Sequence, residues 1–291
     1  MKNIPFLLLS LSGILLFGSC KQDQTAKPLF ELEQNTGIHF DNKVVDGKLE
    51  NSFLFRNFYN GGGVAIGDIN NDGLPDIFFT SNMEENKLYL NKGGFRFQDI
   101  TPGSGIVQDS MWSTGVVFAD INNDGWLDIY VCNSGHMSSG HRKNKLYINN
   151  HNLTFTESSA QYGLDISAYT TQVSFFDYDN DGDLDCFMIN NSPIPVNTLN
   201  NSNRRDLPDK DWPVEDFLKG GGDHLFRNDN GHFTEVSQEA GIHGSLISFG
   251  LGVSVGDVNG DGYPDVFVSN DSYERDYLYI NQKNGTFKDE L

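Results

Sequence analysis

From about residue 60 onwards, short apolar runs alternate with clusters of Gly, Asn and Asp. The apolar runs are rich in Val, Ile, Phe and Tyr, a composition that favours β-strands. No stretch of comparable length shows the period of an amphipathic helix. The pattern therefore predicts an all-β fold in which polar turns separate many short strands.

One polar stretch recurs and divides the chain into similar units, with successive copies 52, 57 and 80 residues apart. The copies are 68–76 (DINNDGLPD), 120–128 (DINNDGWLD), 177–185 (DYDNDGDLD) and 257–265 (DVNGDGYPD). One strand precedes each loop, one follows it, and two more come after, separated by an Asn/Gly turn. Four antiparallel strands per unit are typical of a β-propeller blade, so we expect about four blades. A β-sandwich array is the alternative, although its sequence period is longer.

Each Asp-rich loop carries oxygen ligands at a spacing that suits calcium, a hard cation that takes six to eight oxygens. Side chains at loop positions 1, 3, 5 and 9 supply oxygens, position 7 supplies its carbonyl, and Gly at position 6 allows the sharp turn. The sequence thus predicts about four Ca²⁺ ions. The predicted ligands are Asp68, Asn70, Asp72, Leu74, Asp76, Asp120, Asn122, Asp124, Trp126, Asp128, Asp177, Asp179, Asp181, Asp183, Asp185, Asp257, Asn259, Asp261, Tyr263 and Asp265.

A plain hairpin turn is the alternative interpretation of these loops, because Asn-Asp-Gly favours tight turns. A bare turn does not require Asp at positions 1 and 9, however, and all four copies have it. The loops also differ from EF-hands, which carry a bidentate Glu at position 12. That position holds Phe79, Val131, Met188 and Val268. We therefore expect a calcium loop set in a β-hairpin.

The charge of the chain agrees with bound cations. Lys and Arg number 20 against 40 Asp and Glu, which gives a formal net charge of −20. Four calcium ions would add +8 and leave −12. Such a surface repels phosphates and argues against nucleic acid as a partner. A hydrophobic content of 37% and an aromatic content of 12% argue against disorder.

Residues 1–19 have the pattern of a lipoprotein signal peptide. Lys2 gives a positive start, and the apolar run 4–17 is too short to span a bilayer. Small residues in FGSC lead directly to Cys20, the predicted site of lipidation; an ordinary signal peptide cut nearby is the alternative. Lys21 follows, so an Asp retention signal is absent at that position. Residues 20–28 are then a linker, and a lipid would be the only membrane attachment.

Two further cysteines, Cys132 and Cys186, could pair in an exported protein. Cys132 follows Asp128 by four residues and Cys186 follows Asp185 by one, which places them on different relative faces of their strands. We therefore predict two free, buried thiols.

The four units resemble FG-GAP/VCBS repeats, the repeats of the integrin α-subunit β-propeller. The matching text is GVAIGDINNDGLPDIFF, GVVFADINNDGWLDIYV, QVSFFDYDNDGDLDCFM and GVSVGDVNGDGYPDVFV. The resemblance covers roughly residues 60–291, and we assign 29–291 to the propeller. It implies that calcium loops lie on one propeller face and ligands on the opposite face. With Cys20, the sequence also looks like the start of VCBS repeat-containing lipoproteins of Bacteroidetes-type bacteria.

Both ends of the repeat region suggest an N-terminal portion of a longer protein. The chain stops directly on the last strand of the fourth unit. Residues 29–40 look like another last strand and its exit, which would normally close the ring with the final blade. We expect an open or incomplete ring: four blades of a propeller of about seven.

The connectors opposite the calcium loops are the expected ligand-binding face. The third unit has an insertion there, 192–222, rich in Pro, Asn and Asp. A long loop of this kind is usually functional or disordered, and a packing flap is the further alternative. The candidate ligand-binding residues are Trp112, Tyr169, Arg204, Arg205 and Trp212. The aromatic rings could stack on sugars or fill gaps between blades.

No HExxH zinc helix, phosphate-binding loop or GxSxG elbow occurs, so we do not expect an enzyme. The sequence predicts a calcium-binding module for an extracellular protein or glycan, held in the cell envelope as an outer-membrane or surface lipoprotein. The alternative is the propeller portion of a polysaccharide lyase.

Overall fold

The computed structural model describes residues 29–291 apart from 49, 56, 108–110, 136–141, 193–206, 208, 272 and 273. It has two compact units, Met1–Gln34 and Asn35–Leu291. In the first unit, the described residues 29–34 contain no helix or strand. The predicted signal peptide, the linker and Cys20 lie outside the described residues.

The second unit contains four antiparallel sheets, each built from four consecutive strands. The first sheet comprises β1 (Val64–Gly67), β2 (Asp76–Phe79), β3 (Lys87–Asn91) and β4 (Phe97–Asp99). The second comprises β5 (Trp112–Ala119), β6 (Asp128–Ser134), β7 (Lys145–Asn149) and β8 (Phe155–Glu157). The third comprises β9 (Thr170–Phe176), β10 (Asp185–Asn190), β11 (Asp223–Asn228) and β12 (Phe233–Glu235). The fourth comprises β13 (Gly250–Gly256), β14 (Asp265–Asn270), β15 (Tyr277–Asn281) and β16 (Phe287–Asp289).

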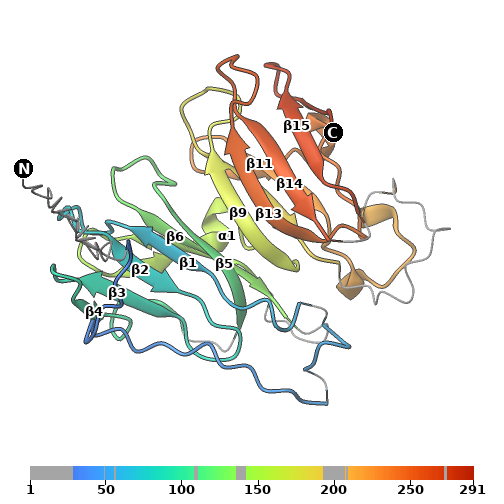
Figure 1. Ribbon diagram of the computed structural model, residues 1–291. Coiled ribbons are helices and arrows are strands. Elements are labelled where there is room, and N and C mark those ends of the chain that lie inside the picture. Colours follow the sequence, from blue (N-terminus) through green and yellow to red (C-terminus); the bar gives the residue numbers. More distant parts are fainter. Residues whose placement is uncertain are drawn as a thin grey trace, which may run out of the picture. The chain divides into compact units, whose positions relative to one another are not determined.

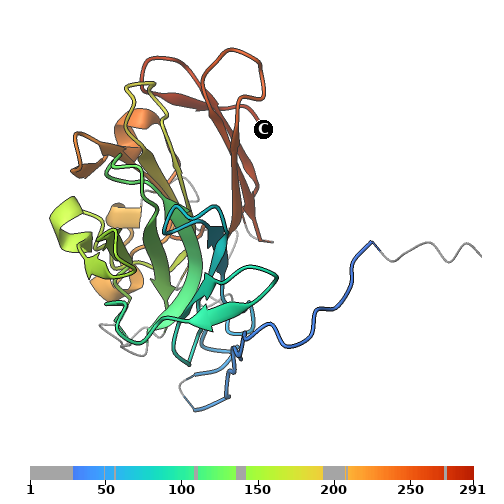
Figure 2. The same ribbon diagram turned by 90° about the vertical axis from the view of Figure 1, so that its left-hand side faces the viewer.

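The sheets follow one another in chain order, and their first strands are neighbours. β5 contacts both β1 and β9, and β9 in turn contacts β13. Figure 1 shows this succession from the first sheet in blue-green to the fourth in red, and Figure 2 shows it from the side. No sheet closes on itself among the described strands. The prediction of an all-β fold with four-stranded blades is confirmed, and the arrangement matches about four blades of an open ring.

Three hydrophobic cores hold the blades together, one at each junction. The first core joins side chains such as Phe78 and Ile129 from the first and second blades. Ile189 and Val268 belong to the core between the third and fourth blades. Successive side chains of a strand point to opposite faces, so each inner blade packs against both its neighbours.

The outward faces of the two terminal blades keep apolar side chains exposed. On β1, Val64 and Ile66 are 54% and 65% exposed, whereas Ala65 between them is 6% exposed and lies in the first core. On the fourth blade, Phe267 is 37% exposed between the core residues Val266 and Val268. These positions alternate with core residues in the way that a face packed against a further blade would require.

Cys132 and Cys186 are free and buried, as predicted. Both lie in the core between the second and third blades. Their opposite orientation on their strands makes Cys132 face the third blade and Cys186 face the second. The predicted difference in orientation is confirmed, and it brings both thiols to the same core without joining them.

A glycine turn follows each of the first three blades and lies against the last strand of the next blade. Gly105 has φ +87°, and a Cβ added to it would lie 2.2 Å from the Phe155 carbonyl oxygen. Gly37, with φ +86°, makes the same approach to Phe97. Residues 29–40 were predicted to form a last strand and its exit. The exit turn is present, but no strand forms, since the described residues offer it no partner strand.

Two single-turn helices, α1 (Ser159–Tyr162) and α2 (Ser237–Ala240), occupy connectors between blades. They are too short to leave a periodic pattern in the sequence. The described part of the insertion adds two 3₁₀ turns, Asp209–Asp211 and Asp216–Leu218. Within the described ranges, no helix has the length and hydropathy of a membrane span.

Candidate metal centres

The four Asp-rich loops form the hairpins between the first and second strands of each blade, and the carboxylate at position 1 organises each loop. Asp68 Oδ1 accepts the Asp72 N–H at 3.1 Å, and its Oδ2 accepts the Gly73 N–H at 2.7 Å. The same pair of bonds recurs at Asp120, Asp177 and Asp257. The repeat therefore gives each loop the same curled backbone.

The carboxylates at position 5 tighten the curl by accepting the N–H of the residue at position 7. The acceptors are Asp72, Asp124, Asp181 and Asp261, and the donors are Leu74, Trp126, Asp183 and Tyr263, at 2.9, 2.9, 2.9 and 3.0 Å. Each acceptor retains lone pairs beyond those used by backbone amides, because a carboxylate has about four acceptor sites.

The Asp at position 9 is the first residue of the second strand and is buried in every blade. Asp128 Oδ2 accepts the Ile121 N–H at 3.0 Å, and its Oδ1 accepts the Asn149 N–H at 2.8 Å. Asp76, Asp185 and Asp265 make equivalent bonds. This residue therefore links the loop to the third strand of its own blade.

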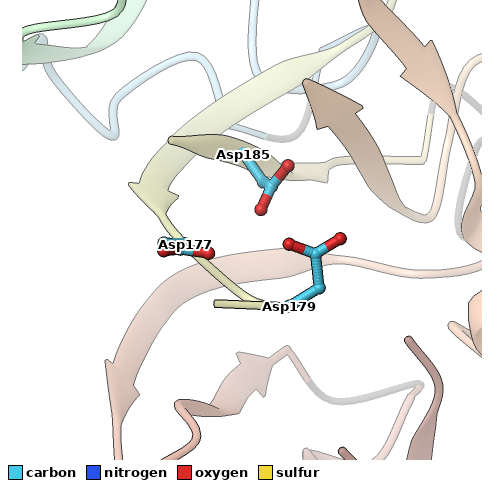
Figure 3. Close-up of side chains that lie close together, drawn as sticks. All are labelled: Asp177, Asp179 and Asp185. Atoms are coloured by element: carbon cyan, nitrogen blue, oxygen red, sulfur yellow. The ribbon is translucent and has the colours of Figure 1, made fainter. Parts of the chain in front are cut away.

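The third loop brings three carboxylates together. Oxygen atoms of Asp177, Asp179 and Asp185 lie within 4.8 Å of one another and point toward a common centre (Figure 3). Asp179 Oδ1 is buried and has no hydrogen-bond partner among the described residues. No other group of three His, Cys, Asp or Glu ligand atoms converges in this way in the described part of the chain.

The other three loops have Asn at position 3. In the first two loops its side-chain amide turns onto the carboxylate at position 5. Asn70 Nδ2 donates to Asp72 Oδ2 at 3.0 Å, and Asn122 Nδ2 donates to Asp124 Oδ2 at 2.9 Å. In the fourth loop, position 3 is Asn259. The Asn70 and Asn122 amides occupy oxygens that a cation would otherwise share, whereas Asp179 in the third loop has no amide to donate and keeps one buried oxygen without a partner among the described residues.

The electrostatics of the loops favour a bound cation. Burial raises the pKa of Asp76, raises that of Asp128 to about 6 and raises that of Asp185 to about 7. Backbone N–H groups oppose these shifts, and the neighbouring loop carboxylates add to them. The pKa of Asp179 is likewise raised by burial and by Asp181 and Asp177. A cation at the centre would stabilise the ionised form of each group.

Two basic side chains that the sequence reasoning missed reach the loops from the turn between the third and fourth strands. His151 Nε2 lies 3.0 Å from Asp124 Oδ2, and the imidazole stacks on Trp126 with a centroid distance of 4.7 Å. Lys283 Nζ lies 3.4 Å from Asp261 Oδ2. The sequence of these turns does not indicate a metal site. Their distance from the Asp loops depends on how the strands of the blade pair, which the sequence does not show.

The donor set fits calcium. Every side chain offered at positions 1, 3, 5 and 9 presents carboxylate or amide oxygen, the ligand type that hard cations prefer. A buried carboxylate oxygen without a partner, Asp179 Oδ1, marks the centre of the third loop. When bound, the ion would neutralise the carboxylates and stabilise the hairpin through which the blade turns.

The predicted ligand-binding aromatic residues take part in packing. Trp112 contacts Phe55 and Phe58, with ring centroids 5.4 and 5.1 Å away. Tyr169 is 1% exposed, and the Arg142 guanidinium lies 4.1 Å from its ring centroid.

Trp212, in the insertion, is buried against Leu246 and Ile247 and donates its Nε1–H to the Leu207 carbonyl at 2.9 Å. It therefore attaches this part of the insertion to the connector before the fourth blade. Arg204 and Arg205 lie outside the described residues.

A cavity of about 500 Å³ opens at the start of the first strands, at the end of the blades opposite the Asp loops. Glycines, apolar side chains and neutral polar groups line it, and the polar residues include Thr114, Thr171, Gln172 and Asn191. Asn191 is 2% exposed, and neither its Oδ1 nor its Nδ2 has a partner among the described residues. The cavity thus offers uncharged donors and acceptors.

Comparison with known proteins identifies the repeats. The sequence profile of a family described as "FG-GAP-like repeat" matches residues 68–131, 135–188, 217–268 and 257–290, more than half of the chain. Cartilage acidic protein 1 of Xenopus tropicalis is 33% identical over 138 residues, which are 47% of this chain and 21% of that protein. The human protein of the same name is 30% identical over 133 residues, 45% of this chain and 20% of its own length. The matched stretch thus spans about a fifth of these relatives.

Proposed function

Because the chain belongs to the FG-GAP-like repeat family, we propose that it is a calcium-binding β-propeller module that recognises an extracellular protein or glycan. The observation that carries the calcium proposal is the convergence of Asp177, Asp179 and Asp185 on one centre with an unpartnered oxygen. The repetition of the same amide bonds in the other three loops extends the proposal to about four ions.

Calorimetric titration of the chelated protein with CaCl₂ tests this proposal. We expect several ions to bind and the melting temperature to rise, because a ligand that binds only the folded state stabilises it. Titration with MgCl₂ is the control for a preference for calcium over a smaller, strictly octahedral ion. A melting curve that is the same with calcium and with chelator would contradict the proposal.

The recognition proposal rests on the cavity lined by Gln172 and Asn191. Its neutral polar lining and volume suit part of a sugar or a peptide backbone rather than a charged group. Screening against a glycan array in calcium, with Asn191→Ala as the cavity variant and Asn91→Ala as a distant control, tests the glycan arm. A glycan that binds both variants equally well would exclude this cavity as its site.

We further propose that the protein acts by binding and not by catalysis. The catalytic alternative is tested by incubation with uronate polysaccharides, where a lyase would produce the absorbance of an unsaturated product. Such a signal would overturn the proposal.

For the location, we propose a cell-envelope lipoprotein attached by a lipid on Cys20, with no nucleic-acid partner. The support is the residue pattern before Cys20 and the net charge of −20. Mass spectrometry of the mature N-terminus should find a diacylglyceryl group on Cys20, and Cys20→Ser should release the protein from membranes. An unmodified N-terminus at another residue would contradict this proposal.

A further inference from the structure

A second cavity, of about 380 Å³, lies beside the third blade at the end opposite the Asp loops. Its wall combines the start of β11, the end of β12, α2 and the connector that leads to the fourth blade, together with one side chain of the insertion. The polar side chains that line it are Lys210, Asp223, His224, Glu235, Ser237, Gln238 and His243.

Asp223 occupies a repeat position whose side chain has a structural task in the other blades. There the Oδ1 atom at this position accepts the backbone N–H at the end of the second strand. The acceptors are Asn86, Asn144 and Asp276, the donors are Ser81, Asn133 and Asn270, and the distances are 2.8, 2.7 and 2.8 Å. In the described part of the third blade, Asp223 makes no such bond.

The Asp223 carboxylate is instead buried without a partner. The residue is 0% exposed, and neither Oδ1 nor Oδ2 has a hydrogen-bond partner among the described residues. The preceding residue, Gly222, ends the insertion with φ +88° and lies so close to the connector before the fourth blade that a Cβ would be 2.6 Å from the Ser245 nitrogen. An unpaired buried carboxylate is costly, so its persistence at the cavity wall points to a missing partner.

The other charged side chains of the cavity have hydrogen-bond partners. Glu235 Oε1 lies 2.8 Å from His224 Nδ1, and Lys210 Nζ donates to Gln238 Oε1 at 2.9 Å. With both histidines counted as neutral, two carboxylates face one ammonium, which leaves one negative charge, that of Asp223. Burial raises the pKa of Asp223 to about 7 and the charge of Glu274 adds to the rise, while a protonated His224 and a polar contact with the Tyr279 hydroxyl act in the opposite direction. The group is thus charged in mildly alkaline buffer.

A bare metal ion does not fit this cavity as built. In the part of the chain that the structure describes, the one group of three converging carboxylate, imidazole or thiol ligand atoms is that of the third Asp loop. An organic cation needs no such convergence. It brings its own N–H donors, and a carboxylate with two unused oxygens accepts them in a short, charge-assisted contact.

We propose that this cavity binds an organic cation whose primary ammonium or guanidinium group donates hydrogen bonds to the Asp223 carboxylate. The site is separate from the calcium loops and from the cavity at Asn191, and the proposal depends on neither. A volume of about 380 Å³ accommodates a group of the size of a lysine or arginine side chain.

Calorimetric titration of the full chain with cadaverine and with agmatine tests the proposal and distinguishes an ammonium from a guanidinium ligand. Saturating calcium keeps the probes off the Asp loops, and a buffer near pH 8 keeps Asp223 ionised. We expect a dissociation constant on the order of 1 mM for at least one probe. Tetramethylammonium, which has no N–H donor, and the uncharged 1,5-pentanediol should not bind.

Three variants connect the binding to Asp223. Asp223→Asn should weaken it at least about tenfold and should fold, because Asn stands at the same repeat position in the first two blades. Asp276→Asn removes a charge at the equivalent position of the fourth blade and should leave binding unchanged. Lys210→Gln removes the one ammonium and should strengthen it. Failure of both probes to bind, or equal binding by Asp223→Asn and the unaltered chain, would overturn the proposal.

Discussion

The side-chain amide of Asn149 donates a hydrogen bond to the Ile69 carbonyl oxygen, 2.8 Å away, and so joins the second blade to the Asp loop of the first. The backbone N–H of Asn149 donates to Asp128 Oδ1, also at 2.8 Å. One buried residue therefore contacts the loops of two neighbouring blades. The arrangement recurs at Asn281, whose amide donates to the Tyr178 carbonyl at 2.8 Å.

Asn149→Ala should lower the free energy of unfolding by about 1–3 kcal/mol, because it leaves the buried Ile69 carbonyl without this donor. Urea denaturation in calcium measures the change. Asn91→Ala is the matched control, since Asn91 Nδ2 reaches only the Pro75 carbonyl of its own blade, at 2.8 Å. Equal losses in the two variants would show that the contact between blades adds nothing.

Gly105→Ala should be among the most destabilising single substitutions in the chain. The added Cβ would lie 2.2 Å from the Phe155 carbonyl oxygen, at φ +87°. Gly103 has the same φ, but nothing lies within 4 Å of its Cβ position. Gly103→Ala should therefore cost only the left-handed strain, about 1 kcal/mol, and Gly105→Ala several times more. Thermal melts compare the two; similar melting temperatures would refute the proposed close approach.

The repeat made the blades and the Asp loops predictable, because each depends on a short pattern that occurs four times. Asp68, Asp120, Asp177 and Asp257 hold their loops through bonds to amides four and five residues later, which are local interactions. Strand alternation also gave the relative orientation of the two cysteines. It did not show that opposite orientations on neighbouring blades bring both to one core.

Features that depend on contacts between distant segments were not predictable. The burial of Tyr169 and Trp212 depends on where the Arg142 side chain and the connector before the fourth blade lie. In the sequence Asp223 is one more copy of a repeat position, and that pattern does not indicate that its carboxylate is buried without a hydrogen-bond partner among the described residues. His151 gave no signal either, because its contact with Asp124 crosses a hairpin.

The thiols of Cys132 and Cys186 should be unreactive in the folded protein. Both are fully buried, and burial raises the pKa of each thiol, which disfavours the nucleophilic thiolate. Ellman's reagent should detect neither thiol in the native mature protein and both after denaturation in urea. Rapid native reaction would show that the core between the second and third blades opens easily.

Without calcium, the protein should become less stable as the pH rises from about 4 to about 7. Burial raises the pKa of Asp128 to about 6 and those of Asp185 and Asp223 to about 7, from an ordinary value of 3.8. Between these limits the folded chain binds more protons than the unfolded chain. The stability that these protonated carboxyl groups contribute is therefore complete below their pKa in the unfolded chain. It is lost as the pH rises through their pKa values in the folded chain.

Thermal melts in EDTA measure this dependence, and the melting temperature should be higher near pH 5 than near pH 8. Asp223→Asn removes one of the three groups and should reduce the difference. Saturating calcium should also reduce it, because the ion stabilises the ionised forms of Asp128 and Asp185. If the chelated protein melts at a higher temperature near pH 8 than near pH 5, the raised pKa values of these three carboxyl groups are contradicted.

Asp179→Asn should weaken calcium binding at the third loop by about tenfold, because it replaces one of three converging carboxylates with the amide found at position 3 of the other loops. The fold should be preserved for the same reason. Asp183→Asn removes a charge from the same loop, but this carboxylate accepts the Asn230 N–H at 3.2 Å and lies outside the converging group. It should therefore have a smaller effect. Calorimetric titration resolves the affected site as a single weaker class among the ions bound. If both substitutions weaken binding equally, the third loop attracts calcium through its overall charge and not through a ligand at Asp179.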